Sequence, residues 1–217
     1  SGGDRRPRGP IRISVPVSFG VRYLAPLVAE FVNIQPEVSL DVDYNDRQVN
    51  LIESGIDMAV RITSQLDPTQ VARRLSTSRM LTLASPDYLA RHGRPELPQD
   101  LAAHHCLGYT ASARSSWPFR VDGETLWVPV KSRLQSNSGD ALVDACQRGL
   151  GICRQPSFIA APALKAGLLE AILTDYPGPE VGIYAVFPSN RYLPTRVRAL
   201  ADYLAECLGP VPSWDQG

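Results

Sequence analysis

The feature that most constrains the fold of this chain is a change of hydrophobic period within residues 11–31. Residues 11–15 alternate between apolar and polar side chains, which is the pattern of a half-buried β-strand. Residues 24–31 instead carry apolar side chains three and four positions apart, which is the spacing of one helix face. The sequence therefore predicts a strand that leads directly into a helix.

Ser18 lies in the turn between this strand and this helix, after Pro16 and before Gly20. Its hydroxyl is placed to cap the helix by accepting a hydrogen bond from a backbone N–H group. A helix start also leaves N–H groups unpaired and carries partial positive charge, so it can bind an anion. The sequence leaves both roles of Ser18 open, an ordinary cap and a ligand contact.

The next segments repeat the order of strand and helix. Residues 38–43 alternate as a strand, residues 49–56 have the apolar spacing of a helix, and residues 56–62 are a third apolar strand. This order predicts a parallel sheet with helices on its faces. Ligands of such sheets bind outside the carboxyl ends of the strands. The polar residues at these ends are Ser18, Asn45 and Arg61.

The second half of the chain predicts further strands, helices and a hairpin. Ser85-Pro86-Asp87 is typical of a helix start, and Asp122-Gly123 within the alternating residues 117–130 predicts a β-hairpin. A helix is predicted over residues 139–148, and another helix precedes the last residues. Residues 210–217 are expected to be disordered.

Charge and hydropathy exclude some classes of function. Lys plus Arg and Asp plus Glu number 22 each, whereas a chain that bound nucleic acid alone would usually be basic. Residues 1–10 are interpreted as a polar linker arm in which three arginines are solvated. No apolar run reaches the roughly 18 residues of a membrane span, and no signal peptide is visible. We therefore expect a cytoplasmic chain that does not contact a membrane.

The cysteines and histidines lack the patterns of metal and catalytic sites. No cysteine pair has CxxC spacing, which favours reduced cytosolic thiols, and the histidines lie outside any metal motif. Cys153 could be a redox sensor, although buried cysteine is usually inert. There is no Walker loop, nucleophile elbow or dinucleotide loop. We expect no metal, no cofactor and no enzymatic activity. The cysteines are Cys106, Cys146, Cys153 and Cys207.

Several motifs taken together resemble the effector-binding domain of LysR-type transcriptional regulators over about residues 9–208. Residues 51–61 are similar to the L-x-x-G-x-D-L-A-I-R run of this family, and residues 84–93 resemble its crossover into a second subdomain. The other matching segments are Gly9-Pro10-Ile11-Arg12-Ile13-Ser14, Leu24-Ala25-Pro26-Leu27, Ser136-Asn137-Ser138, Gly149-Leu150-Gly151-Ile152 and Pro156.

The resemblance implies an α/β fold like that of type 2 periplasmic binding proteins. In this fold two α/β subdomains are joined by two crossover strands, and an effector binds in the cleft. By this analogy residues 11–83 and 187–209 form subdomain I, and residues 84–186 form subdomain II. Residues 1–10 would be a linker remnant and residues 210–217 a C-terminal tail.

The same resemblance implies partners for the chain. The family senses small molecules, and a carboxylate is one class of effector that the candidate residues could hold. Its members bind DNA through an N-terminal helix-turn-helix domain that lies outside this chain, which would explain the balanced charge. They assemble as homodimers or homotetramers. Two rival functions are less favoured. A solute-binding component of a transporter would share the fold, but no signal peptide is visible, and an enzyme would need a set of catalytic groups that the sequence does not show.

Seven residues are candidate ligand contacts, and three of them follow the first strands. Asn45 could donate its amide to a carboxylate, or it could be an ordinary turn residue. Arg61 could clamp an anion with two parallel hydrogen bonds, or it could form a surface ion pair with Asp57. The seven candidates are Ser18, Asn45, Arg61, Asn137, Ser138, Arg154 and Pro156.

The other candidates belong to the predicted second subdomain. Asn137 and Ser138 open the predicted helix 139–148, and ligand contact is favoured over simple capping by Ser138. Arg154 departs from the family, which usually has a small or apolar residue there. Because burying a charge is costly, Arg154 could reach into the cleft and favour an acidic effector, or it could point to solvent. Pro156 follows as a family landmark.

Overall fold

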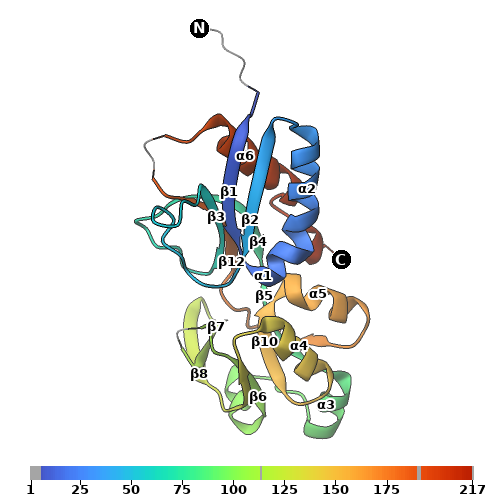
Figure 1. The fold of residues 1–217 in the computed structure, drawn as a ribbon. Helices are drawn as coiled ribbons and strands as arrows, with labels where there is room; N and C mark the ends of the chain where they lie inside the picture. Colours follow the sequence, from blue (N-terminus) through green and yellow to red (C-terminus); the bar gives the residue numbers. More distant parts are fainter. Residues whose placement is uncertain (1–5, 113, 190–191, 217) are drawn as a thin grey trace. The chain divides into compact units, whose positions relative to one another are not determined.

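The chain folds into two α/β units in the computed structural model, which describes residues 6–112, 114–189 and 192–216. Unit 1 contains the residues up to Thr77 together with Val181–Gln216, and unit 2 contains Ser78–Glu180. Each unit has its own five-stranded sheet and its own helices (Figure 1).

The passages between the units occur after Thr77 and after Glu180, whereas the sequence placed them after residues 83 and 186. The strand β5 (Met80–Ala84) pairs with two strands of unit 2 and so belongs to that unit. The strand β12 (Val181–Phe187) pairs with β3 (Met58–Thr63) of unit 1 and so belongs there. Strand pairing, which the sequence does not reveal directly, decides these boundaries.

The sheet of unit 1 has the order β2-β1-β3-β12-β4. The first three strands pair in parallel, as the sequence predicted, whereas β12 runs antiparallel to β3. Ile11, Ile13 and Val15 of β1 are buried as the alternation predicted, and Ser14 is buried as well. The remaining bounds in this sheet are β1 (Gly9–Val15), β2 (Val38–Tyr44) and β4 (Val71–Ser78).

Two helical runs cover the sheet of unit 1. The first combines α1 (Val17–Phe19), a π-helical turn η1 (Gly20–Leu24) and α2 (Ala25–Ile34), and the second is α6 (Thr195–Leu208). The two runs contact each other and pack against β1 and β2 (Figure 1). Their buried face supplies much of the unit 1 core, which includes Phe19, Leu24, Phe31, Val197, Leu200 and Leu204.

The run Val17–Ile34 is the one helix in the described part of the chain that is long and apolar enough to cross a membrane. Its 18 residues have a mean hydropathy of 1.2, although the sequence indicated no apolar run of this length because Arg22 and Glu30 interrupt it. One face of the run is buried in unit 1, and core helices commonly combine this length and hydropathy.

The predicted helix over residues 49–56 is wrong. Residues 45–57 contain neither helix nor strand, with a turn at residues 51–55, and Ile52 is 72% exposed, so the expected apolar face is not buried. The Asn50 side chain accepts a hydrogen bond from the Glu53 N–H group, and Gly55 has a positive φ of 66°. A short helix needs tertiary packing of its apolar face, and here only Ile56 is buried.

The sheet of unit 2 has the order β11-β5-β10-β6-β9, and the predicted hairpin forms a separate pair of strands, β7 and β8. Asp122 and Gly123 make its turn with positive φ values, as their sequence indicated. The strands are β6 (Cys106–Tyr109), β7 (Ser116–Val121), β8 (Glu124–Pro129), β9 (Ser132–Ser136), β10 (Ile152–Pro156) and β11 (Glu170–Ile172).

The helices α3 and α4 of unit 2 begin at the starts that the sequence predicted. Ser85 caps α3 by accepting a hydrogen bond from Tyr88 N–H, and Pro86 is its first residue. The inner face of the hairpin contributes Trp117, Phe119 and Val128 to one core cluster with Tyr88. The helical bounds are α3 (Pro86–His92), the 3-10 helix η2 (Pro98–Ala103), α4 (Gly139–Gln147) and α5 (Ser157–Lys165).

The expectation that residues 210–217 are disordered is wrong for the described residues up to 216. A short 3-10 helix η3 (Ser213–Asp215) places Trp214 in unit 1 with 7% of its surface exposed. The indole ring lies 4.6 Å from the Tyr23 ring and 5.5 Å from the Phe19 ring, centroid to centroid. Its Nε1–H donates to the Thr77 carbonyl at 3.2 Å. The tail is therefore part of the unit 1 core.

Candidate functional site

Ser18 lies in the first turn of the helical run of unit 1 and does not cap it. The N-cap residue is Pro16, and no side-chain cap bond is made there. The Ser18 Oγ atom is buried without a hydrogen-bond partner among the described residues. A buried polar atom without a partner costs about 1–3 kcal/mol.

The same helix start already has an acid beside it. The Val17 N–H group donates to Oδ1 of Asp46 at 3.1 Å. A carboxylate at this position neutralises the partial positive charge of the helix start and repels a second anion. The expectation of an anion at this helix start is therefore weakened, and a neutral ligand group suits Ser18 better. The sequence does not reveal this contact, because Asp46 and Val17 are 29 residues apart along the chain.

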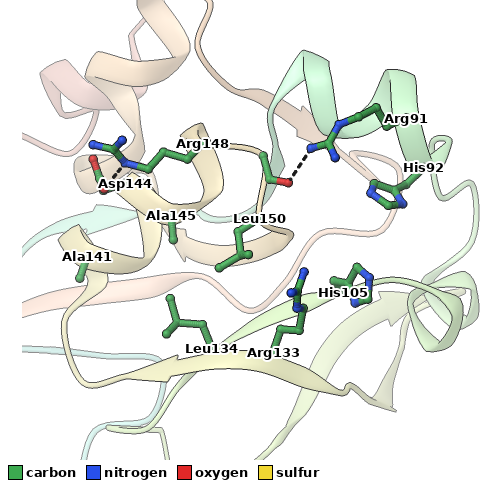
Figure 2. Close-up of a pocket in the computed structure, with 11 residues that line it drawn as sticks. Arg91, His92, His105, Arg133, Leu134, Ala141, Asp144, Ala145, Arg148 and Leu150 are labelled. Carbon is green, nitrogen blue, oxygen red and sulfur yellow. Dashed lines mark hydrogen bonds and ion pairs between the residues drawn. The ribbon is translucent and has the colours of Figure 1, made fainter.

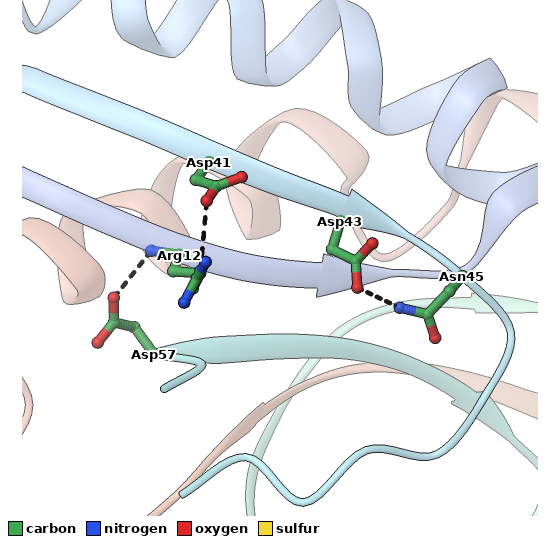
Figure 3. A network of polar contacts seen from close by, with 5 residues as sticks. All are labelled: Arg12, Asp41, Asp43, Asn45 and Asp57. Atoms are coloured by element: carbon green, nitrogen blue, oxygen red, sulfur yellow. Dashed lines mark hydrogen bonds and ion pairs between the residues drawn. The ribbon is translucent and has the colours of Figure 1, made fainter. Parts of the chain in front are cut away.

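Asn45 is held within its own turn, as the turn interpretation predicted. Its amide nitrogen donates to Asp43 at 2.6 Å (Figure 3), and its Oδ1 accepts from the Arg47 N–H group at 3.0 Å. The amide nitrogen also reaches Ser14 Oγ at 3.4 Å. A ligand carboxylate at Asn45 would have to replace the bond to Asp43 or the longer bond to Ser14.

Arg61 does not pair with Asp57. Asp57 accepts a hydrogen bond from the Arg12 N–H group at 2.8 Å, and the Arg12 side chain pairs with Asp41 (Figure 3). Nη1 of Arg61 donates to the Val60 carbonyl at 3.0 Å, and burial lowers the pKa of the guanidinium from its usual value. Arg61 therefore keeps donors for an anion, while the ion-pair interpretation is wrong among the described residues.

Ser138 and Asn137 differ in whether their polar side-chain groups are still available to a ligand. Ser138 caps α4, since its Oγ accepts from the Ala141 N–H group at 3.1 Å. Asn137 is exposed, and its amide has no hydrogen-bond partner among the described residues. The capping interpretation of Ser138 is therefore confirmed. Asn137 is the side chain at this helix start that is free to bind a ligand. Pro156 is the N-cap residue of α5 and offers only its ring and carbonyl.

Arg154 is buried within unit 2, so the expectation that it points to solvent is wrong. It is 6% exposed, and its guanidinium carbon lies 4.2 Å from the centroid of the Phe119 ring. Nη1 donates to the Pro118 carbonyl, whereas Nε and Nη2 are buried without partners. Burial lowers the pKa of Arg154 to about 10. The charge is therefore held by one carbonyl and one aromatic face.

The cysteines of unit 2 are in a setting that suppresses thiolate chemistry. Cys106, Cys146 and Cys153 are fully buried. A hydrogen bond with Cys146, together with burial, raises the pKa of Cys153 well above its usual value, and burial raises that of Cys106 to about 12. A redox sensor needs an accessible thiolate, so this geometry gives the redox interpretation of Cys153 no support. Within the described ranges, no group of three or more potential metal ligands is present.

A second polar region of unit 2 is an open pocket of about 630 Å3 along α4 (Figure 2). Arg148 pairs with Asp144, and Arg91 pairs with Asp87 and donates to the Gly149 carbonyl. Figure 2 shows the Arg133 guanidinium between Leu150 and His105. Since two arginines of this pocket are neutralised by neighbouring acids, it can hold an anion only weakly. This pocket could not be predicted from the sequence, because its walls come from distant segments.

His104 should make the free energy of unfolding depend on pH. The Tyr88 hydroxyl lies 2.7 Å from His104 Nδ1, and burial is the first cause that lowers the pKa of His104 below its usual value. The unfolded chain therefore binds a proton more readily, so stability should fall as pH drops below about 6.5. Urea unfolding between pH 8 and pH 5 should show this loss in the wild type. His104→Gln should reduce the loss, and an unchanged pH slope would contradict the assignment.

Comparisons with known proteins all identify the same protein family. The family model described as the LysR substrate binding domain matches residues 4–208. An HTH-type transcriptional regulator of Haemophilus influenzae is 34% identical over 195 residues, which cover 89% of this chain and 68% of that protein. The regulator PtxR of Pseudomonas aeruginosa is 34% identical over 95% of this chain and 66% of its own length.

Solved structures show the same likeness. The regulatory domain of CrgA, a LysR-type transcriptional regulator from Neisseria meningitidis, is 30% identical with a TM-score of 0.79. The match covers 94% of this chain and all of that domain. Against the longer CrgA chain, the match covers 92% of this chain and 68% of CrgA. This chain also spans only 59% of a related regulator from Xanthomonas campestris.

Proposed function

Since the chain belongs to the LysR substrate binding domain family, the effector-binding domain of LysR-type transcriptional regulators, we propose that it senses a small molecule for a longer DNA-binding protein. DNA contact would be made through an N-terminal helix-turn-helix domain. We place the full protein in the cytoplasm as a homodimer or homotetramer, as its family supports. A transporter component and an enzyme are not favoured by these relatives.

The observation that carries the proposal is the unsatisfied hydroxyl of Ser18. A serine that only capped its helix would bond a backbone N–H group, and Ser18 does not. Its position follows the carboxyl end of β1, where ligands of parallel α/β sheets are held. In unit 2 the exposed amide of Asn137 supplies a comparable free polar group beside the capped start of α4.

The proposed mechanism is a shift between conformational populations. An effector can change the state of the regulator only by binding one state more tightly than the other. A ligand group that forms a hydrogen bond with the Ser18 hydroxyl gains binding free energy only in the conformational state in which this bond can form. This difference would then be transmitted to subunit assembly and to the DNA-binding domains.

The test is a thermal-shift screen of the chain against small carboxylates, aromatic acids, amino acids and neutral metabolites. A ligand at about 100 times its dissociation constant should stabilise the wild type by about 2.7 kcal/mol. We expect Ser18→Ala to weaken binding of that ligand by about tenfold, which equals about 1.4 kcal/mol, and Asn137→Ala tests the candidate residue of unit 2 separately.

Ser39→Ala is a matched control for the serine substitution, because Ser39 is an exposed residue of β2. Its dissociation constant should equal that of the wild type. Asn45→Ala removes the amide that is bonded to Asp43 within the turn. If Asn45 serves only the turn, this variant should keep the affinity for the ligand. Full effector affinity in both Ser18→Ala and Asn137→Ala would refute the site assignment.

A further inference from the structure

All three histidines of the chain lie around Tyr88 in unit 2. The His92 ring stacks on the Tyr88 ring at 4.6 Å and meets the His105 ring edge-on at 5.7 Å, centroid to centroid. The Tyr88 hydroxyl accepts a hydrogen bond from the His105 N–H group at 3.2 Å and lies 2.7 Å from His104 Nδ1. The buried tyrosine thus positions His92 and His105, which are exposed and line the pocket along α4.

Arg133 reaches the same pocket because the pairing of β6 with β9 is irregular. Cys106 pairs with Ser132. The next residue of β6 pairs with Leu134, so the pairing skips Arg133. Successive residues of a regular strand point to opposite faces, whereas an extra residue in a strand changes the direction of a side chain. Arg133 and Leu134 accordingly both line the pocket, and Arg133 is exposed there.

The charge of Arg133 is not balanced by an acid. The charged and titratable groups that face His92 and His105 are Arg91 with its partner Asp87, Arg148 with its partner Asp144, Arg133 and His104. The two ion pairs cancel, and among the described residues no acid pairs with Arg133. Imidazoles gain positive charge between pH 8 and pH 5. The pocket therefore holds an anion weakly through Arg133 at high pH, and protonation of His92 and His105 adds two positive charges to it.

We propose that this pocket is a pH-dependent site for a small organic phosphate, whose phosphate group binds between Arg133, His92 and His105. Figure 2 shows these three side chains toward one end of the pocket, at the right of the view. They come from three different elements, so their donors approach a ligand from several sides. A phosphate group suits this arrangement better than a carboxylate, because it has three acceptor oxygens and roughly two negative charges near pH 7.

The rest of the pocket suits the organic part of such a ligand. Leu134 and Ala141 lie toward the end away from the histidines, and Leu150 lines the pocket between the two ends (Figure 2). The volume of about 630 Å3 is within the usual range of small-molecule sites. The site uses residues of unit 2 alone, so it rests neither on Ser18 nor on the proposed function.

The test measures dissociation constants of sulfate, inorganic phosphate, phenyl phosphate and benzoate by isothermal titration calorimetry at pH 8, pH 7 and pH 6. Sulfate keeps both negative charges over this range, so a change in its affinity reports protonation of the protein. We expect sulfate to bind about tenfold more tightly at pH 6 than at pH 8, because a bound anion favours charged imidazoles. Phenyl phosphate should bind about tenfold more tightly than inorganic phosphate, since its ring is removed from water. Benzoate, which has the same ring and a carboxylate, should bind more weakly than phenyl phosphate.

Variants assign the binding to this pocket. Arg133→Met removes the unbalanced charge and should weaken sulfate and phenyl phosphate by about tenfold or more. Arg120→Met is the matched control, because Arg120 is an exposed arginine of β7 outside the pocket, and it should bind both probes like the wild type. The double variant His92→Gln with His105→Gln should keep the sulfate affinity of pH 8 and lose the increase at pH 6.

Three results would overturn the inference. The first is a sulfate affinity that does not change with pH or that Arg133→Met leaves intact. The second is equal affinity for phenyl phosphate and benzoate, which would mean that the pocket does not recognise phosphate. The third is loss of phenyl phosphate binding in Ser18→Ala, which should keep it. In that case the compound binds at the effector site, so the pocket is refuted while the proposed function stands.

Discussion

Replacing Trp214 by alanine is expected to lower the free energy of unfolding by about 3–5 kcal/mol, the usual cost of removing a buried tryptophan. The indole is 93% buried and packs against the rings of Phe19 and Tyr23 in the first turns of the unit 1 helix. Its loss would leave a void beside that helix start and would leave the Thr77 carbonyl without its donor. Urea unfolding of the chain measures this cost.

Two variants calibrate the result. Trp214→Phe keeps most of the aromatic packing and removes the Nε1–H donor, so it should cost about 1–3 kcal/mol. Val211→Ala changes a residue of the same segment that is 64% exposed, and it should shift stability by less than about 0.5 kcal/mol. A Trp214→Ala variant as stable as Val211→Ala would show that the C-terminal segment does not pack on unit 1.

The parts of the fold that the sequence predicted well are those with a strong local pattern. The first strand and its helix, the three parallel strands and the Asp122-Gly123 hairpin are confirmed, because period and turn chemistry are local properties. The segment 49–56 has a helical apolar spacing too, but most of that face finds nothing to pack against. The C-terminal segment shows the reverse case. Its proline-rich sequence predicted disorder, but Trp214 is buried in the core of unit 1.

The roles of the candidate site residues were harder still to predict from the sequence. The sequence singled out Ser18, Ser138 and Arg154 by position, yet their roles depend on neighbours that are distant along the chain. Asp46 takes the helix start that Ser18 was expected to cap, and Pro118 and Phe119 enclose Arg154. Of these three, only Ser138 bonds a residue close in sequence, and this capping bond is the alternative that local chemistry offered beside ligand contact.

Phe119→Ala is expected to destabilise the chain by about 3–5 kcal/mol. The ring is 1% exposed in the core cluster of unit 2, and it also covers the Arg154 guanidinium. Phe119→Leu, which keeps much of the apolar volume, should cost less, and thermal or urea unfolding would rank the two variants.

Phe119→Leu also measures how much the aromatic ring stabilises the buried charge of Arg154. A desolvated cation over an aromatic face gains about 2 kcal/mol. In an Arg154→Met background this gain is absent, so Phe119→Leu should cost less there than in the wild type, by up to about 2 kcal/mol in a double-mutant cycle. Equal costs in both backgrounds would mean that the ring acts only as apolar volume. Arg154 would then depend on the Pro118 carbonyl alone among its described polar contacts.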